Sequence, residues 1–306
     1  MADYAVASGY TSMSSTYIPE IWAGKMVIKF YRSTVFGAIS NTNYQGNITK
    51  FGDKVHIRVV PDITISTYVI GQGLDYERPT TSDVELDIDQ GHYYAFAVNK
   101  VEQVQSDLPY VEKWTDDAGQ QMAITIDTAI LAAIYSDVHA SNTGIAAGAD
   151  SGDIDLGITG TPEVVDKTNI LDYIVDWGTV LDEQSIPDTE RWCIMPPSLC
   201  GLVKKSDLKD ASLAGDGTSI LRNGRIGAID RFMTYRSNSV AKNGTTPEEW
   251  NLIFGHPSCL TFASQIVEHE TLKNQNDFGD LIRGLQVYGY KVINSKGIGH
   301  FVASKS

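Results

Sequence analysis

The residue types that most often carry out catalysis or bind metals are scattered along this chain without a recognised spacing. The six histidines, at positions 56, 92, 139, 256, 269 and 300, never lie three or four residues apart, so no helix can bring two of them to one metal ion. His269 stands between Glu268 and Glu270, but strand alternation would point the two glutamates away from it. Gly71 and Gly73 lack the third glycine of a dinucleotide-binding loop, and neither a phosphate-binding loop nor a serine-nucleophile motif occurs. We therefore predict no catalytic residue, no cofactor and no metal site.

The cysteines and one aspartate-rich loop also favour structural roles. Three cysteines are odd in number and too few for a disulfide framework in a chain of this length, so we expect reduced, buried side chains. These residues are Cys193, Cys200 and Cys259. Within residues 139–161, Asp150, Asp153 and Asp155 depart from the spacing of a calcium-binding loop, and no distal glutamate is in place.

Length and composition describe a folded protein that is acidic. The chain has 306 residues, about two domains' worth. Its 42% hydrophobic and 20% charged residues are far from the composition of a disordered protein. The 24 basic and 38 acidic residues give a net charge of −14. This charge argues against a protein that binds nucleic acid over its whole surface, but it allows a local basic strip.

No segment predicts export or membrane insertion. The first twenty residues lack a basic start followed by a continuous apolar run. The most apolar stretch, residues 129–135, is far shorter than the ~20 residues of a membrane-spanning helix. We therefore expect a soluble protein made in a reducing cytoplasm, with no membrane partner.

The most informative segment predicts two strands that alternate between charged and apolar residues. Its cations are Lys54, His56 and Arg58, and its anions are Glu85, Asp87 and Asp89. Antiparallel pairing with residue numbers that sum to 143, such as 54 with 89, sets every cation opposite an anion and the apolar residues opposite one another. The connection, residues 61–82, is too long for a simple turn. We predict a two-stranded arm whose apolar face lies either on this protein's own core or on a neighbouring subunit.

The N-terminal region combines an arm with an amphipathic helix. Residues 1–15 are rich in Ser and Thr and show no period, which indicates an arm without its own core. In residues 16–33, apolar side chains recur every four positions at Trp22, Met26 and Phe30 and predict a helix. The same helix carries a basic stripe that consists of Lys25, Lys29 and Arg32. This basic stripe is either a solvated face or a contact for an acidic neighbour or a polyanion.

The rest of the chain predicts a long helix followed by an α/β segment. Apolar residues step by three or four over residues 107–135, which predicts a helix about 43 Å long. Beyond the loop at 139–161 we expect a helix that is capped by Thr168 and has one apolar face, made of Ile170, Ile174, Trp177 and Leu181. A buried strand at 191–195 follows, and residues 196–198 turn into another helix. Candidate strands toward the C-terminus are 253–254, 266–267, 285–290 and 300–302.

Tyrosine is abundant, with 15 residues, and many of them lie in the predicted arms, where charges are acidic or absent. Tyr68 and Tyr76, for example, lie in the connection between the two ribbon strands. Stacking on single-stranded nucleic acid needs basic residues interleaved with aromatic ones. We therefore expect these tyrosines to make protein contacts.

Three stretches of the chain are similar to segments of a known family. Residues 17–36 (YIPEIWAGKMVIKFYRSTVF) have a hydrophobic-Pro-Glu opening and a Val-Phe close, and residues 52–64 (GDKVHIRVVPDIT) begin with Gly-Asp. Residues 224–240 (GRIGAIDRFMTYRSNSV) contain a glycine, a hydrophobic strand and then Ser-Asn. Together with the order of the predicted elements, they resemble the major capsid proteins of tailed double-stranded DNA phages, which have the Hong Kong 97 type fold.

The resemblance implies an α+β fold with an N-terminal arm, an extended β-hairpin loop, a peripheral domain with a long spine helix, and an α/β axial domain. The N-terminal arm and helix would occupy residues 1–46 and the extended loop, the β-ribbon, residues 47–92. The peripheral domain would comprise residues 93–139 and 262–306, and the axial domain residues 140–261.

The resemblance also implies self-assembly into pentamers and hexamers of an icosahedral head. The shell would form in the host cytoplasm as a procapsid around a scaffolding protein, and would become a virion that holds packaged double-stranded DNA without sequence-specific binding. Portal and decoration proteins would be further partners. The charged residues of the ribbon, with Tyr68 and Tyr76, would make contacts between subunits. Some members cross-link a Lys to an Asn with a Glu as catalyst, but no local signature places that triad in this chain.

The residues alone leave a second class of function open. The chain would then be a soluble α/β enzyme or ligand-binding protein with an unrecognised site in residues 140–261. The two classes differ in an observable property, because a shell protein assembles into rings, tubes or shells and the alternative does not.

Overall fold

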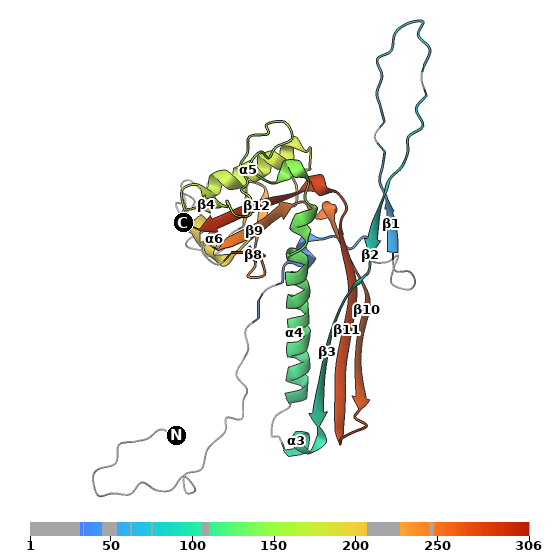
Figure 1. The fold of residues 1–306 in the computed structure, drawn as a ribbon, viewed down its shortest axis with the longest axis vertical. Helices are drawn as coiled ribbons and strands as arrows, with labels where there is room; N and C mark the ends of the chain where they lie inside the picture. Colours follow the sequence, from blue (N-terminus) through green and yellow to red (C-terminus); the bar gives the residue numbers. More distant parts are fainter. Residues whose placement is uncertain are drawn as a thin grey trace, which may run out of the picture.

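The structure has three parts that differ in how helices and sheets are combined (Figure 1). This computed structural model describes residues 31–32, 34–44, 54–61, 63–74, 76–105, 110–206, 227–244 and 248–305. A seven-stranded sheet with helices against it is the first part, a long helix beside a three-stranded sheet is the second, and a two-stranded ribbon extends from the second part. No helix in these residues combines the length and the apolar character needed to cross a membrane.

The seven-stranded sheet is built around two strands that are buried at every position. These are β5 (Arg191–Met195) and β9 (Glu249–Gly255), as expected for strands covered on both faces. The strand order is β4-β12-β9-β5-β7-β6, with β8 paired to β9. The other members are β4 (Glu163–Val165), β6 (Ala228–Ile229), β7 (Phe232–Arg236), β8 (Lys242–Asn243) and β12 (Ile298–Lys305).

Two helices pack in the same part and confirm the sequence prediction. Helix α5 (Ile170–Glu183) buries Ile170, Ile174, Trp177 and Leu181, although its N-cap is Asn169 and not the predicted Thr168. Helix α6 (Pro197–Lys205) begins directly after Pro196. Trp177 of α5 stacks on Phe254 with ring centroids 5.2 Å apart and meets Phe301 edge-on at 5.3 Å. Aromatic contacts of this kind add to the stabilisation from burial alone, and they fix α5 on β9 and β12.

The second part places the long helix against one edge of an antiparallel sheet. Helix α4 (Tyr110–Leu131) packs on β3 (Gln90–Asn99), where Phe96 and Trp114 meet edge-on at 6.0 Å. The sheet order is β10 (Leu260–Lys273), β11 (Gly279–Val292) and β3. Short helices α3 (Lys100–Gln105) and α1 (Phe36–Ile39) complete this part.

The predicted C-terminal end of the long helix is wrong. The helix ends at Leu131 instead of Tyr135, so its 22 residues span about 33 Å. The Ala133 N–H donates to the carbonyl of Ile130, three residues back, and a 3-10 turn follows at Ile134–Asp137. This tightening directs the fully buried Ile134 into the main core.

The last strand differs from the expectation that residues 262–306 belong to the peripheral part. Strand β12 pairs with β9 and β4 in the seven-stranded sheet. A turn at Ser295–Gly297 redirects the chain after β11, and Ile298 and Phe301 then enter the main core. Burial of this apolar strand between two partner strands explains why it leaves the peripheral sheet. The predicted strands at 253–254, 266–267, 285–290 and 300–302 are confirmed within β9, β10, β11 and β12.

Replacing Gly119 by Ala is expected to stabilise the unassembled subunit by roughly 0.5–1 kcal/mol, because glycine in a helix interior costs backbone entropy. Gly119 lies within α4, and a Cβ there meets nothing within 4 Å. Urea denaturation of the full-length subunit measures the change. Gly201→Ala in α6 is a second test of the same effect and should also raise the midpoint, since its Cβ position is also open. A lower midpoint for both variants would contradict the expectation.

Candidate interaction surfaces

The ribbon base consists of β1 (Lys54–Arg58) and β2 (Asp83–Asp87), and its register differs from the predicted one. The two strands pair antiparallel as expected, but Lys54 lies opposite Asp87 and His56 opposite Glu85, so the residue numbers sum to 141. The predicted sum of 143 is therefore wrong by two residues. A shift of two keeps every side chain on its face, so the cations still lie opposite anions.

The tertiary path of the chain explains the shift in register. Asp89 does not pair with Lys54, because β2 ends at Asp87. The chain then begins β3 at Gln90, where it pairs with β11. Ile88, at the crossing, is 8% exposed and packs in a small cluster with Ala263 of β10. Burial of Ile88 against the three-stranded sheet therefore ends the pairing of the ribbon.

The charged face of the ribbon base forms a network on the surface. Lys54 Nζ lies 3.2 Å from Glu85 Oε2 and 3.0 Å from Asp87 Oδ1, and these two carboxylates raise the pKa of Lys54, Asp87 most strongly. His56 Nδ1 lies 2.6 Å from Asp83 Oδ2. Arg58 has no carboxylate within ion-pair distance among the residues that the structure describes. Exposed pairs of this kind contribute little to the stability of the subunit.

Three of these side chains also have metal-binding atoms close together. The donor atoms of His56, Asp83 and Glu85 all lie within 4.8 Å of one another, although all three side chains are exposed. They already contact one another, and the Lys54 ammonium also bonds Glu85. The arrangement is therefore explained without a metal ion. Sequence spacing did not predict this group, because Asp83 lies opposite Arg58 only in the observed register.

The apolar face of the ribbon base lies on this protein's own core, which was the first of the two alternatives. Ile57 is 6% exposed and Leu86 is fully buried, and both pack with Ile88 and Ala263. Val55 and Val84 are partly buried against the same cluster. The base of the ribbon is therefore part of the folded subunit.

The distal loop, residues 59–82, has the opposite character. Its described residues form no strand and extend as a long loop from the ribbon base (Figure 1). They leave many large apolar side chains in solvent. These side chains are Val60, Ile63, Ile65, Tyr68, Val69, Ile70, Leu74 and Tyr76. Ile65 and Ile70 are each 90% exposed, and Tyr76 is 89% exposed. An apolar surface of this extent indicates an interaction site.

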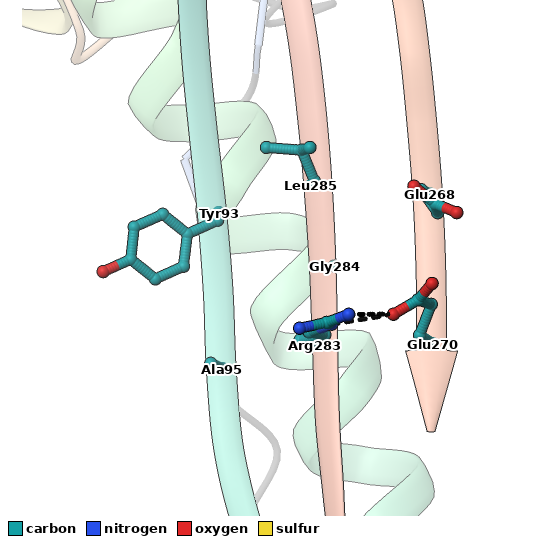
Figure 2. A pocket seen from close by; sticks show the side chains of 7 residues that line it. All are labelled: Tyr93, Ala95, Glu268, Glu270, Arg283, Gly284 and Leu285. Atoms are coloured by element: carbon teal, nitrogen blue, oxygen red, sulfur yellow. Dashed lines mark hydrogen bonds and ion pairs between the residues drawn. The ribbon is translucent and has the colours of Figure 1, made fainter. Parts of the chain in front are cut away.

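A second surface, the sheet groove, lies on the face of the three-stranded sheet that points away from α4 (Figure 2). It encloses about 410 Å³ and is lined by Tyr93, Ala95, Glu268, Glu270, Arg283, Gly284 and Leu285. Tyr93 is 77% exposed, and Arg283 Nε donates to Glu270 Oε2 at 2.7 Å. The groove was not predicted from the sequence, because β3 lies far along the chain from β10 and β11. The alternation in β3, with Tyr93 and Ala95 on one face and Tyr94 and Phe96 on the other, was the available signal.

His269 and His300 make structural contacts, and the three cysteines are buried. His300 is buried, its Nε2 lies 3.0 Å from Asn251 Oδ1, and burial lowers its pKa to about 4. His269 Nδ1 lies 2.7 Å from the hydroxyl of Tyr94, while Glu268 and Glu270 line the groove on the other face, as alternation predicts. The three cysteines are free and buried, which confirms that prediction. Burial raises the pKa of Cys193 to about 12, so this thiol stays protonated.

Most of the predicted N-terminal helix, including Lys25 and Lys29 of the basic stripe, lies outside the described residues. Arg32 is described, is exposed and is not helical. Its neighbour Tyr31 donates a hydrogen bond from its hydroxyl to Asp117 Oδ1 at 2.9 Å, which raises the pKa of Tyr31. Tyr31 therefore lies beside the first half of α4.

Comparisons with known proteins point to one family. Residues 83–299, more than half of the chain, match the family model described as phage capsid protein. A solved structure from Mycobacterium phage Che8 is 26% identical, with a TM-score of 0.76 over 96% of this chain and 98% of that one. The capsid structure of cyanophage P-SCSP1u is 14% identical, with a TM-score of 0.73 over 98% and 97% of the two chains. The capsid asymmetric unit of cyanophage Pam1 is 11% identical, with a TM-score of 0.68 over 100% and 99%. No curated protein matches the chain.

Proposed function

The chain belongs to the phage capsid protein family, and from this premise we propose that it builds an icosahedral phage head from pentamers and hexamers that enclose packaged double-stranded DNA. It is a structural major capsid protein of a tailed phage with the Hong Kong 97 type fold, and its place is the capsid of the virion. Family membership also decides against the alternative of an α/β enzyme with a site in residues 140–261.

The observation that carries the proposal is the exposure of the distal loop. A single subunit leaves Ile65, Ile70 and Tyr76 almost entirely in solvent, although the ribbon base beside them is well packed. Burying one isoleucine side chain stabilises a contact by about 1.5–3 kcal/mol. A neighbouring copy of the same chain offers that burial wherever subunits lie side by side in a shell.

The sheet groove fits the distal loop of a neighbouring subunit. Tyr93 and Leu285 offer apolar surface, and Glu268 has no ion-pair partner among the described residues. The distal loop carries apolar side chains together with an exposed cation, Arg78. Apolar burial supplies most of the affinity in this arrangement, and the opposite charges set the register of the contact.

The remaining site residues act around this contact. Lys54, His56, Arg58, Glu85, Asp87 and Asp89 surround the root of the loop and direct it toward the neighbour, and Tyr68 and Tyr76 contact the neighbour directly. The basic stripe of Lys25, Lys29 and Arg32 meets acidic surface on another subunit.

We propose the division of the chain into arm (1–46), extended loop (47–92), peripheral domain and axial domain, with β12 counted in the axial domain. Assembly takes place in the host cytoplasm around a scaffolding protein, with portal and decoration proteins as further partners. The net charge of −14 gives the shell a wall that repels phosphate, so packed DNA moves along it without sequence-specific binding.

Electron microscopy and sedimentation of the purified full-length protein test the function. Rings, tubes or closed shells are the expected result. A protein that stays strictly monomeric over a wide range of concentration and salt would overturn the proposal.

Reversing one charge of the proposed contact is expected to raise the concentration needed for assembly several-fold, since an exposed pair contributes up to about 1 kcal/mol. Arg78→Glu and Glu268→Lys each place like charges together, and the double variant restores the opposite pair in swapped positions. Light scattering against protein concentration measures the threshold for each variant. Equal thresholds for the double and the single variants would show that these two residues do not meet.

A further inference from the structure

Asp127 is a buried carboxyl group at a junction of three segments, and none of the proposed assembly contacts uses it. Its side chain is on α4 and is 2% exposed. The segment 34–36, which leads into α1, lies on one side of it, and Ser239 of the segment 237–240, which follows β7, lies on the other. The residue therefore joins the start of the described chain and a loop of the seven-stranded sheet to the long helix.

One oxygen of this group holds the start of α1. Asp127 Oδ1 accepts the N–H of Val35 at 3.0 Å and the N–H of Phe36 at 2.9 Å. Val35 is the N-cap of α1, and the helix has no side-chain cap from its own sequence. Unpaired N–H groups at a helix start need such an acceptor. Asp127 supplies it from a position more than ninety residues along the chain.

The other oxygen is left without a donor. Asp127 Oδ2 has no partner at hydrogen-bond geometry, and the same is true of the buried Ser239 hydroxyl. Ser239 is nevertheless close enough to influence the carboxyl group. An ionised carboxylate would place negative charge on this buried oxygen, which is costly away from solvent. A neutral carboxyl group has no such cost and has a proton to share with Ser239.

No charge in the surrounding segments offsets the burial. The side chains within one turn of Asp127 on α4 include Ala123, Ile124, Ile130 and Leu131, and the two segments packed against it contribute only residues without charge. Those residues are Thr34, Val35 and Phe36 on one side, and Ser237, Asn238, Ser239 and Val240 on the other. Burial raises the pKa of Asp127, and the two N–H groups and Ser239 oppose this only in part.

We propose that Asp127 is a proton-binding clamp, which takes up one proton from solvent when segments 34–36 and 237–240 close over α4. The neutral carboxyl group then keeps the junction shut. No other bond forms or breaks, and the proton returns to solvent when the junction opens.

The sign of the pH dependence follows from the raised pKa. A group whose pKa is higher in the closed junction stabilises that junction in full below its pKa in the open state, about 3.9 for Asp. This contribution falls as the pH rises, and it is lost once the pH passes the pKa of the closed state. The N-terminal segment is therefore held more firmly at acidic pH than at neutral pH.

Hydrogen exchange at the Val35 and Phe36 amides of the full-length protein tests the clamp. After correction for the intrinsic rate, protection in the natural protein is expected to fall by up to tenfold per pH unit above about pH 3.9, and to level off beyond the pKa of the closed state. Asp127→Asn keeps an oxygen acceptor and cannot ionise, so its protection should not change with pH.

Two further variants separate the clamp from a purely structural role. Glu112→Gln removes an exposed charge from α4 and should show the same fall as the natural protein. Asp127→Ala removes the acceptor and should lose protection at every pH. A natural protein without pH dependence, or an Asp127→Asn variant that loses protection tenfold or more, would overturn the proposal.

Discussion

Replacing Val60–Thr81 by Asn-Gly is expected to leave the subunit folded and to abolish assembly. The Val59 N–H donates to the Ser82 carbonyl at 3.0 Å, so these two residues already face each other across the ribbon. Asn-Gly closes a two-residue hairpin between such partners without strain. The removed residues that the structure describes are exposed except for the half-buried Pro61, so little packing is lost. Closing a loop of two residues instead of 22 costs less entropy, so the free energy of unfolding should rise by roughly 2 kcal/mol.

The loss of assembly follows from the apolar side chains that this replacement removes. Each isoleucine or leucine that becomes buried would contribute about 1.5–3 kcal/mol to a contact between subunits. Since about 1.4 kcal/mol corresponds to a factor of ten in affinity, loss of even one raises the assembly threshold by tenfold or more. Circular dichroism reports the fold, and electron microscopy with sedimentation velocity reports assembly.

A matched control keeps the full length of the distal loop. Thr80→Ala and Thr81→Ala change exposed polar residues of the same loop and should assemble normally. Shells formed by the shortened protein would show that the distal loop is not an assembly contact. Unfolding of the shortened protein would instead show that the loop belongs to the core of its own subunit.

Gly289→Ala is expected to destabilise the subunit by roughly 1–3 kcal/mol and to prevent shells from closing. Gly289 lies on β11 directly beneath the crossing from ribbon to sheet, where an added methyl group would overlap the Asp87 carbonyl oxygen and lie 3.1 Å from Ile88 Cα. These are backbone atoms, so they cannot rotate away as a side chain would. The ribbon must then lift from the sheet, which separates Leu86 and Ile88 from Ala263.

Urea denaturation and electron microscopy of Gly289→Ala measure these two effects. Gly91→Ala on β3 is the control, because its Cβ would lie 3.9 Å from Val287 and 4.0 Å from the Gln286 carbonyl, which are ordinary contacts. Normal stability and normal shells for Gly289→Ala would show that the ribbon can move at its root without consequence.

The ribbon illustrates how far sequence reasoning could go. Alternation of charged and apolar residues predicted both strands, their antiparallel pairing and their two faces, and all three are confirmed. Charge pairing did not decide the register, because sums of 141 and 143 both place cations opposite anions. Burial of Ile88 in one cluster with Ala263 favours the former, and no local pattern in the sequence places these two residues together.

The assembly surfaces divide in the same way. Tyr68 and Tyr76 were expected to make protein contacts, and both are largely exposed on the distal loop, as such a role requires. The sheet groove was not expected, because Tyr93, Arg283 and Glu268 are brought together only by the pairing of β3, β11 and β10.

The sequence by itself determined the order of the elements, the faces of the ribbon and the absence of a recognised catalytic spacing, because these depend on neighbouring residues and on periods of two or 3.6. The tertiary structure decided where α4 ends, which sheet receives β12 and how the ribbon joins the body. It also decided that the scattered candidate residues join separate structural contacts, such as His300 with Asn251 in the core and His269 with Tyr94 on the sheet. These outcomes depend on which buried surfaces meet, and contacts between residues far apart in the chain determine that.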